Sequence, residues 1–166
     1  YPYATISRTP DSIKEGQNGV IESLYGVQRP IISKEGQLKV YFTRTRFKSR
    51  KDQGEERIEK VFRDLGFQII SPELLTFDEQ INVLRNCSIL AATEGSVTHN
   101  AVFMNEGAEL VIVRKRNFVN EYQLAINEMR ALHVTYIDSH KSTRINKQFS
   151  FAGPFFMYCS KELARF

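Results

Sequence analysis

The sequence has few of the residues from which a metal centre, a disulfide scaffold or a membrane span is built. It contains two cysteines, Cys87 and Cys159, and three histidines, and none of these residues stand at metal-ligand spacing. It has no apolar run of about 18 residues, and no basic segment followed by an apolar stretch, so neither a membrane span nor a signal peptide is predicted. We therefore expect reduced thiols, no metal, and a protein of the cytoplasm or of the inner face of a membrane.

Several catalytic and nucleotide-binding motifs are absent as well. There is no Gly-rich loop ending in Lys-Ser/Thr and no Gly-x-Gly-x-x-Gly, which disfavours an ATPase or a simple NAD enzyme. No Gly-x-Ser-x-Gly nucleophile motif is present, and no period of 20–50 residues indicates a solenoid. We expect no cofactor.

The composition that is present is that of a single globular domain. The chain has 166 residues, of which 42% are hydrophobic and 25% are charged. A chain of this length buries enough surface to fold without disulfides or metals. Because it begins at Tyr1 rather than Met, we expect it to be a piece of a longer protein.

Positive charge is concentrated in one short segment. Lys and Arg number 23 against 19 Asp and Glu, a net charge of +4. Six cations and no acid fall within residues 39–51, so the rest of the chain is near neutral: they are Lys39, Arg44, Arg46, Lys48, Arg50 and Lys51. A focused basic patch on a neutral body favours an anionic ligand or a phosphate pocket. A nucleic-acid surface and a solvated basic loop are the alternatives.

Hydrophobic periodicity predicts alternating strands and helices from Leu38 onward. The first 37 residues, rich in Gly, Pro, Ser and Gln, indicate an irregular strap. Strands are predicted at 38–43, 67–70, 88–92, 109–113 and 133–137, with helices between them and a closing amphipathic segment at 155–166. Two helices are predicted to begin at capping boxes, Asp52 with Glu55 and Thr76 with Glu79. Two further helices are predicted to begin at about residue 97 and at about Asn120.

This alternation predicts an α/β fold, a Rossmann-like three-layer sandwich with a mostly parallel sheet of about five to six strands. We therefore predict two parts of the chain, an irregular N-terminal strap over residues 1–37 and one Rossmann-like domain over residues 38–166.

Two polar loops follow strands of this sheet, where ligands of parallel sheets bind. Arg44 directly follows the first strand, and its guanidinium can hold a phosphate through two parallel hydrogen bonds. Arg46 and Arg50 are less firmly placed in the same loop. The second loop is Thr93-Glu94-Gly95-Ser96, where Gly95 permits close approach to the backbone at a helix N-terminus.

The residues of the second loop allow two interpretations each. Glu94 accepts hydrogen bonds from sugar or ribose hydroxyls, or it stabilises the first turn of the helix. Ser96 caps the helix or donates to a ligand. His99, with Asn100 beside it, faces the ligand one turn further on, or it is packed.

A series of short motifs follows in order along the chain: Tyr41-Phe42-Thr43-Arg44 with the basic residues after it, Gly54-Glu55-Glu56, Gly66-Phe67, Ser71-Pro72-Glu73-Leu74, Phe77-Asp78-Glu79-Gln80, Thr93-Glu94-Gly95-Ser96-Val97-Thr98-His99-Asn100, Phe103-Met104 and the strand Gly107-Ala108-Glu109-Leu110-Val111. In this order and spacing they resemble the donor domain of glycosyltransferase family 61. The resemblance covers about residues 38–138.

The resemblance implies a GT-B enzyme of two Rossmann-like domains, the second of which binds a nucleotide sugar. It implies an inverting, metal-free transfer from a donor, UDP-linked in our expectation, to a polysaccharide or glycan acceptor, and the absence of Asp-x-Asp fits this. The acceptor site and the general base are expected largely on the missing N-terminal domain or in the cleft, so this chain alone is not expected to transfer sugar.

The resemblance also assigns the donor side of the site. It implies that Arg44 contacts the diphosphate, and that the donor lies beside Glu94, Gly95, Ser96, His99 and Asn100. The family's usual turn is His-Gly-Ala, where this chain has Glu94-Gly95-Ser96, which suggests a bacterial, capsular-polysaccharide branch. A non-catalytic nucleotide- or partner-binding module is the alternative function, and a nucleic-acid-binding domain is a weaker one.

Overall fold

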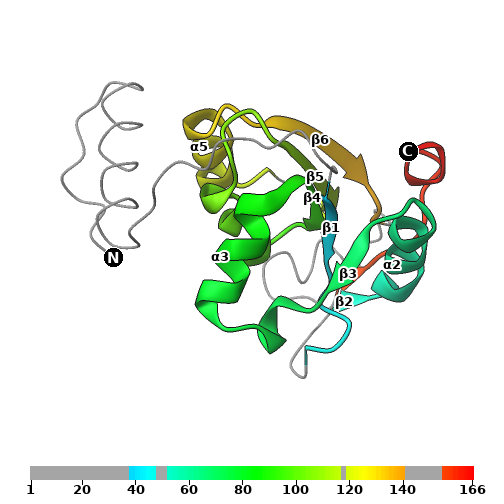
Figure 1. Ribbon diagram of the computed structural model, residues 1–166. Coiled ribbons are helices and arrows are strands. Elements are labelled where there is room, and N and C mark those ends of the chain that lie inside the picture. The colour runs from blue at the N-terminus through cyan, green and yellow to red at the C-terminus, as the bar shows by residue number, and fades with distance from the viewer. Residues whose placement is uncertain (1–37, 48–51, 117–118, 141–154) are drawn as a thin grey trace.

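A computed structural model of the protein describes residues 38–47, 52–116, 119–140 and 155–166 (Figure 1). The strap predicted over 1–37 lies outside these residues, as does Arg50. Among the described helices, none is long and apolar enough to cross a membrane.

The fold is organised around one parallel sheet of five strands. These are β1 (Leu38–Phe42), β3 (Gln68–Ile70), β4 (Cys87–Thr93), β5 (Glu109–Arg114) and β6 (His133–Asp138), in the spatial order β3-β1-β4-β5-β6. Every pair of neighbouring strands is parallel. Helical segments connect the strands that follow one another along the chain. The predicted α/β fold with a parallel sheet is therefore confirmed.

Helices cover both faces of the sheet, as Figure 1 shows. On one face lie α2 (Glu55–Asp64) and the 3-10 turn η3 (Leu163–Arg165); on the other lie α3 (Phe77–Asn86), α4 (Ser96–His99), η2 (Asn100–Phe103) and α5 (Glu121–Met129). Successive side chains of β5 point to opposite faces of the sheet, and each face has its own cluster of buried apolar residues. Leu110 and Ile112 belong to the cluster under α3 and α4, whereas Val111 and Val113 belong to the cluster under α2. The three-layer sandwich is confirmed.

Three helix boundaries agree with the sequence signals. Thr76 caps α3 and forms the capping box with Glu79, since each side chain bonds the backbone N–H of the other residue. Asn120 caps α5 by accepting from the Tyr122 N–H. Gly66, at φ 82°, follows the last turn of α2 in the left-handed conformation that ends many helices.

The capping box predicted at Asp52 is wrong. Asp52 lies in the short strand β2 (Asp52–Gln53), which pairs with β7 (Phe155–Phe156), and the residue that caps α2 is Gly54, which offers no side-chain bond. The Asp52 carboxylate is instead bound by the Lys115 ammonium, a partner distant in sequence. A charge-assisted bond to a buried cation has outweighed the local capping pattern.

Two further predictions need adjustment. The helix expected at about 97–104 has only four α-helical residues and continues as 3-10 helix to Phe103, as expected where the weak helix formers Val97, Thr98 and Asn100 crowd together. The closing segment at 155–166 is the strand β7 followed by η3, whose Leu163 is fully buried under α2.

The strand order places one topological switch point between β1 and β4. From β1 the chain passes to β3 on one side, and β4 then returns to the other side of β1, so the connections diverge between these two central strands. Their carboxyl ends are level, since Phe42 is in register with Ala92. Arg44 and the turn at Glu94 and Gly95 therefore emerge side by side at this edge.

Candidate functional site

Two cations meet over Gly95 at the switch point. Gly95 has φ 146°, a conformation that side-chain-bearing residues rarely adopt, and it sits between β4 and α4. A methyl group built on it would lie 3.8 Å from the Arg44 Nη1 and 3.8 Å from the Lys115 Nζ. The glycine thus leaves open a space that two positively charged groups border.

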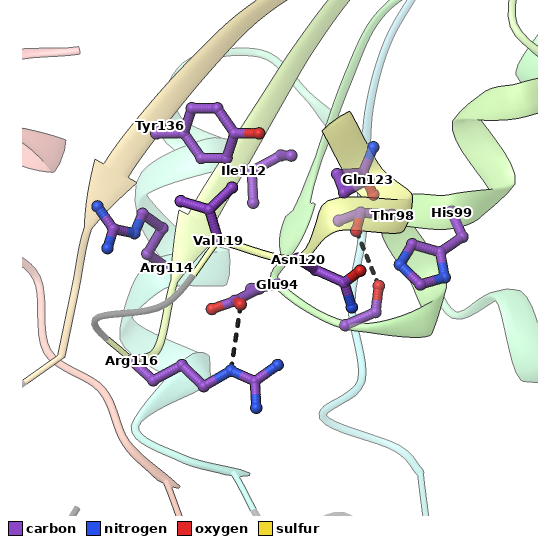
Figure 2. A pocket seen from close by; sticks show the side chains of 11 residues that line it. Glu94, Thr98, His99, Ile112, Arg114, Arg116, Val119, Asn120, Gln123 and Tyr136 are labelled. Carbon is purple, nitrogen blue, oxygen red and sulfur yellow. Dashed lines mark hydrogen bonds and ion pairs between the residues drawn. The ribbon is translucent and has the colours of Figure 1, made fainter. Parts of the chain in front are cut away.

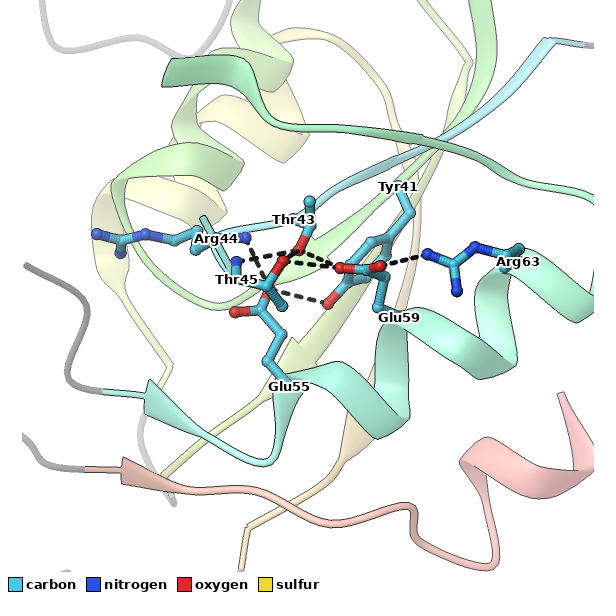
Figure 3. A network of polar contacts seen from close by, with 7 residues as sticks. All are labelled: Tyr41, Thr43, Arg44, Thr45, Glu55, Glu59 and Arg63. Carbon is cyan, nitrogen blue, oxygen red and sulfur yellow. Dashed lines mark hydrogen bonds and ion pairs between the residues drawn. The ribbon is translucent and has the colours of Figure 1, made fainter. Parts of the chain in front are cut away.

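The backbone of Arg44 is held from beneath by α2. Its N–H donates to the Glu55 Oε1 at 3.0 Å, while its side chain extends away from that carboxyl (Figure 3). The guanidinium lies 4.8 Å from the centre of the Phe47 ring. Among the described residues it forms no ion pair with a carboxylate.

The support under Arg44 is a buried polar cluster. Glu55 is fully buried and also accepts from the Tyr41 hydroxyl at 3.1 Å. Burial raises the pKa of Glu55 above its usual range, against the two hydrogen bonds and the Lys115 charge, which lower it. Burial, and then the Glu55 charge, raise the pKa of Tyr41 well above its usual value, so this hydroxyl stays a donor.

The loop that carries Arg44 is tied to α2 at a second point. Glu59 Oε2 accepts from the hydroxyls of Thr43 and Thr45, at 2.8 and 2.9 Å, and Arg63 pairs with its other oxygen (Figure 3). Partial burial raises the pKa of Glu59, but the bonds from Thr43, Thr45 and Arg63 outweigh it and the net shift is downward. The start of the basic loop is therefore fixed by two adjacent turns of one helix.

Lys115 reaches the same place from β5. It directly follows the strand, is 6% exposed, and its Nζ lies 2.9 Å from the Asp52 Oδ2. The ammonium also lies 4.7 Å from the centre of the Phe155 ring, so both of its neighbours come from the small sheet β2–β7.

A pocket opens on the other side of Gly95, between the strand ends and α5 (Figure 2). The Glu94 carboxylate takes part in its wall: Oε1 accepts from the Arg116 Nε at 3.2 Å, and Oε2 is buried without a partner among the described residues. Residues of four elements line the pocket: Glu94, Gly95, Thr98, His99, Ile112, Arg114, Arg116, Val119, Asn120, Gln123 and Tyr136.

The structure brings some of the predicted site residues together and leaves others apart. Arg44 and Gly95 meet, and Glu94 and His99 line the pocket beside them. Burial lowers the pKa of His99, so its ring is neutral at neutral pH. Ser96 is exposed and offers α4 no side-chain cap.

Two other predicted residues point elsewhere. The Asn100 Nδ2 donates to the Gln80 Oε1 on α3 at 3.4 Å, and Asn100 does not line the pocket. Arg46 is exposed in the loop after β1. Because α4 is a single turn, the field of its N-terminus is small, and the side-chain cations carry the positive charge of the site.

Sequence reasoning missed the contribution of β5. Three consecutive cations stand at its carboxyl end: Arg114 is the last residue of β5, and Lys115 and Arg116 follow it. They supply one neighbour of Gly95 and two residues of the pocket wall. The rule that selected Arg44, a cation just beyond a parallel strand, applies to this run as well. In the described residues, no three His, Cys, Asp or Glu side chains gather as a metal site would need.

Comparison with known proteins gives one finding at the level of family. No curated protein matches the chain. The model of the family described as Glycosyltransferase 61 matches residues 6–111, well over half of the chain, and includes Arg44 and the Glu94–Gly95 turn but not Lys115. The chain belongs to glycosyltransferase family 61.

Proposed function

We propose that this chain is the nucleotide-sugar-binding domain of a glycosyltransferase, with the diphosphate of the donor over Gly95 and in contact with Arg44. The observation that carries the proposal is the approach of the Arg44 guanidinium to Gly95 at the switch point of the sheet. Family membership supports a role in glycosyl transfer in general. A guanidinium without an acidic partner in the described part of the chain, beside open backbone, suits a diphosphate because it offers two parallel donors.

The pocket beside Gly95 suits the hydroxyl-bearing part of the same donor. Glu94, Asn120 and Gln123 line it, and the Glu94 Oε2 is buried without a partner among the described residues. A carboxylate oxygen accepts hydrogen bonds only, and a ribose or sugar hydroxyl supplies the donor that it lacks. The two halves of a nucleotide sugar, anionic and hydroxylated, thus correspond to the two sides of the turn.

The chemistry that we propose is an inverting transfer without a metal ion. Cationic side chains aimed at the departing diphosphate stabilise the charge that develops there, as a metal ion does in other enzymes. The acceptor, a polysaccharide or other glycan, and the general base belong in this proposal to the partner domain of a GT-B enzyme, in the cytoplasm or at the inner membrane face.

Binding of nucleotides to the purified chain tests the proposal. UDP, GDP and CMP, and their sugar conjugates, are titrated while thermal unfolding is followed. A ligand at 100 times its dissociation constant adds about 2.7 kcal/mol, which raises the melting temperature of a chain of this size by about 5–10 °C. We expect UDP and its conjugates to give the largest shift.

The matched variants are Arg44→Ala and Arg57→Ala, which remove one positive charge each. Arg57 is exposed on α2 and is not part of the site. Arg44→Ala should abolish most of the shift and Arg57→Ala should leave it intact. The absence of a shift with every nucleotide at millimolar concentration would overturn the proposal.

One observation favours a second function on the same fold, a non-catalytic nucleotide- or partner-binding module. The turn is Glu94-Gly95-Ser96 where the family pattern has His-Gly-Ala. Such a module predicts binding with no transfer in the full-length protein. Sugar transfer by that protein, lost in Arg44→Ala, would exclude it.

A further inference from the structure

We propose that Lys115 is a second anion-binding residue, which contacts the same ligand as Arg44 in the space over Gly95. The inference rests on the proposed function, because it concerns the same anionic ligand. It adds a residue that follows β5 and lies beyond the part of the chain that the family model matches.

The direction of the Lys115 side chain is the first support. An ammonium has three N–H donors. Asp52 accepts from the Lys115 Nζ at 2.9 Å, and the Phe155 ring covers another side at 4.7 Å. The Nζ also borders the space over Gly95, at 3.8 Å from where a side chain would begin, so a donor remains for a group placed there.

The space itself is the second support. Leaving aside the chain neighbours of Gly95, the Arg44 and Lys115 nitrogens are the only described atoms within 4 Å of a methyl group at this glycine. The two nitrogens therefore lie no farther apart than twice 3.8 Å. A ligand with several anionic oxygens, such as a diphosphate, can reach both cations at once.

The charges of the two cations are balanced differently. The Lys115–Asp52 pair is buried, with side-chain exposures of 8% and 4%, whereas Arg44 has no acidic partner among the described residues. Without a ligand, the Asp52 carboxylate compensates the Lys115 charge, which burial would otherwise make unfavourable. An anion over Gly95 then shares the ammonium with Asp52, and the carboxylate opposes the binding of that anion.

This arrangement separates a binding role from a purely structural one. Lys115→Met and Asp52→Asn break the same buried pair, so an ion pair that only stabilises the fold would make the two variants alike. If Lys115 contacts the ligand, the two substitutions have opposite effects on affinity, because one removes the donor and the other removes its competitor.

The experiment measures the affinity of the wild type and both variants for inorganic pyrophosphate and for UDP, by calorimetry at one low salt concentration. We expect Lys115→Met to weaken both affinities by about 10- to 100-fold, the range of a hydrogen bond to a charged group. We expect Asp52→Asn to leave them unchanged or to increase them.

A third variant protects the test against loss of folding. Asp52→Leu/Lys115→Met carries neither charge, and replacing both partners of a buried pair by apolar side chains of similar volume is often close to neutral for stability. Its affinity should be about 10- to 100-fold below that of the wild type.

Three results would overturn the inference, and they are distinguishable. A wild type that binds neither pyrophosphate nor UDP would remove the proposed function together with it. A wild type that binds, with Lys115→Met or the double variant as tight as the wild type, would remove the role of Lys115 alone. Equal weakening in Lys115→Met and Asp52→Asn would assign the pair to the fold only.

Discussion

A glutamate lies on each side of the Gly95 turn, Glu55 toward α2 and Glu94 toward α5, and the two carboxyl groups have different partners. On the α2 side, Glu55 is fully enclosed and accepts from the Arg44 backbone and the Tyr41 hydroxyl. On the α5 side, Glu94 lines a pocket and accepts from Arg116 through one oxygen. Both acids leave their second oxygen without a partner among the described residues.

The second oxygens of the two carboxyl groups lie in different surroundings. Burial raises the pKa of Glu55 above its usual range, and its second oxygen is enclosed beneath the Arg44 loop without a partner among the described residues. Glu94 lines a pocket, and its second oxygen is buried there without a partner among the described residues. The α2 side therefore supports the site by fixing backbone, whereas on the pocket side we propose that a ligand hydroxyl supplies the donor that Glu94 lacks.

The largest effect should come from breaking the support. Glu55→Ala removes the acceptor of a buried hydroxyl and of the Arg44 N–H, and unsatisfied buried donors cost about 1–3 kcal/mol each. We expect the free energy of unfolding to fall by about 3 kcal/mol, measured by urea denaturation.

The control for this prediction is Glu56→Ala, the exposed neighbour in the same helical turn. It loses the same charge near the helix N-terminus and should cost under about 1 kcal/mol. A loss in Glu55→Ala no larger than the loss in Glu56→Ala would show that the buried cluster is not the support.

The next effect concerns the pocket and should appear in binding. Glu94→Gln keeps the shape of the side chain but replaces a carboxylate oxygen by an amide donor. We expect the affinity for UDP to fall about 10-fold, and the affinity for inorganic pyrophosphate, which has no ribose hydroxyls, to stay the same. Calorimetry with both ligands measures the difference.

Glu109→Gln is the charge-matched control, because Glu109 is exposed at the opposite end of β5. It should leave both affinities unchanged. Equal weakening of UDP and pyrophosphate in Glu94→Gln would mean that Glu94 affects the anion side, and the distinction between the two sides of the turn would be lost.

Much of the fold could be predicted from the sequence because its elements carry local signals. The apolar stripe of α2, the capping box at Thr76 and the apolar run of β5 each depend on residues close in sequence. The meeting of the loops after β1 and β4 followed from one rule, that carboxyl ends of parallel strands share an edge.

The errors arose where a distant partner decided the local structure. Asp52 has the spacing of a helix cap, but its partner Lys115 is 63 residues away and no local pattern indicates it. Asn100 stands beside His99 in sequence, yet the change from α to 3-10 helix at this point is accompanied by a hydrogen bond to Gln80 instead of a place in the pocket. The positions of Asp52 and Asn100 therefore depend on partners distant in sequence, and their residue types alone do not predict them.

The smallest effect is a pH dependence of stability on the α2 side. The pKa of Glu55 is raised by burial, so the folded chain keeps a proton that the unfolded chain releases, and stability falls as pH rises from the usual glutamate pKa toward the raised one. The pKa of Glu59 has a net downward shift, so the stability that Glu59 contributes is lost in the opposite direction, as pH falls below the usual glutamate pKa.

Glu55→Gln should abolish the decline in stability above about pH 4.5 and leave the loss of stability at acid pH unchanged. Urea denaturation in steps between about pH 3 and pH 8 measures both limbs. If the decline persisted in Glu55→Gln, another group would be responsible for it, and the raised pKa that we attribute to the burial of Glu55 would have no support.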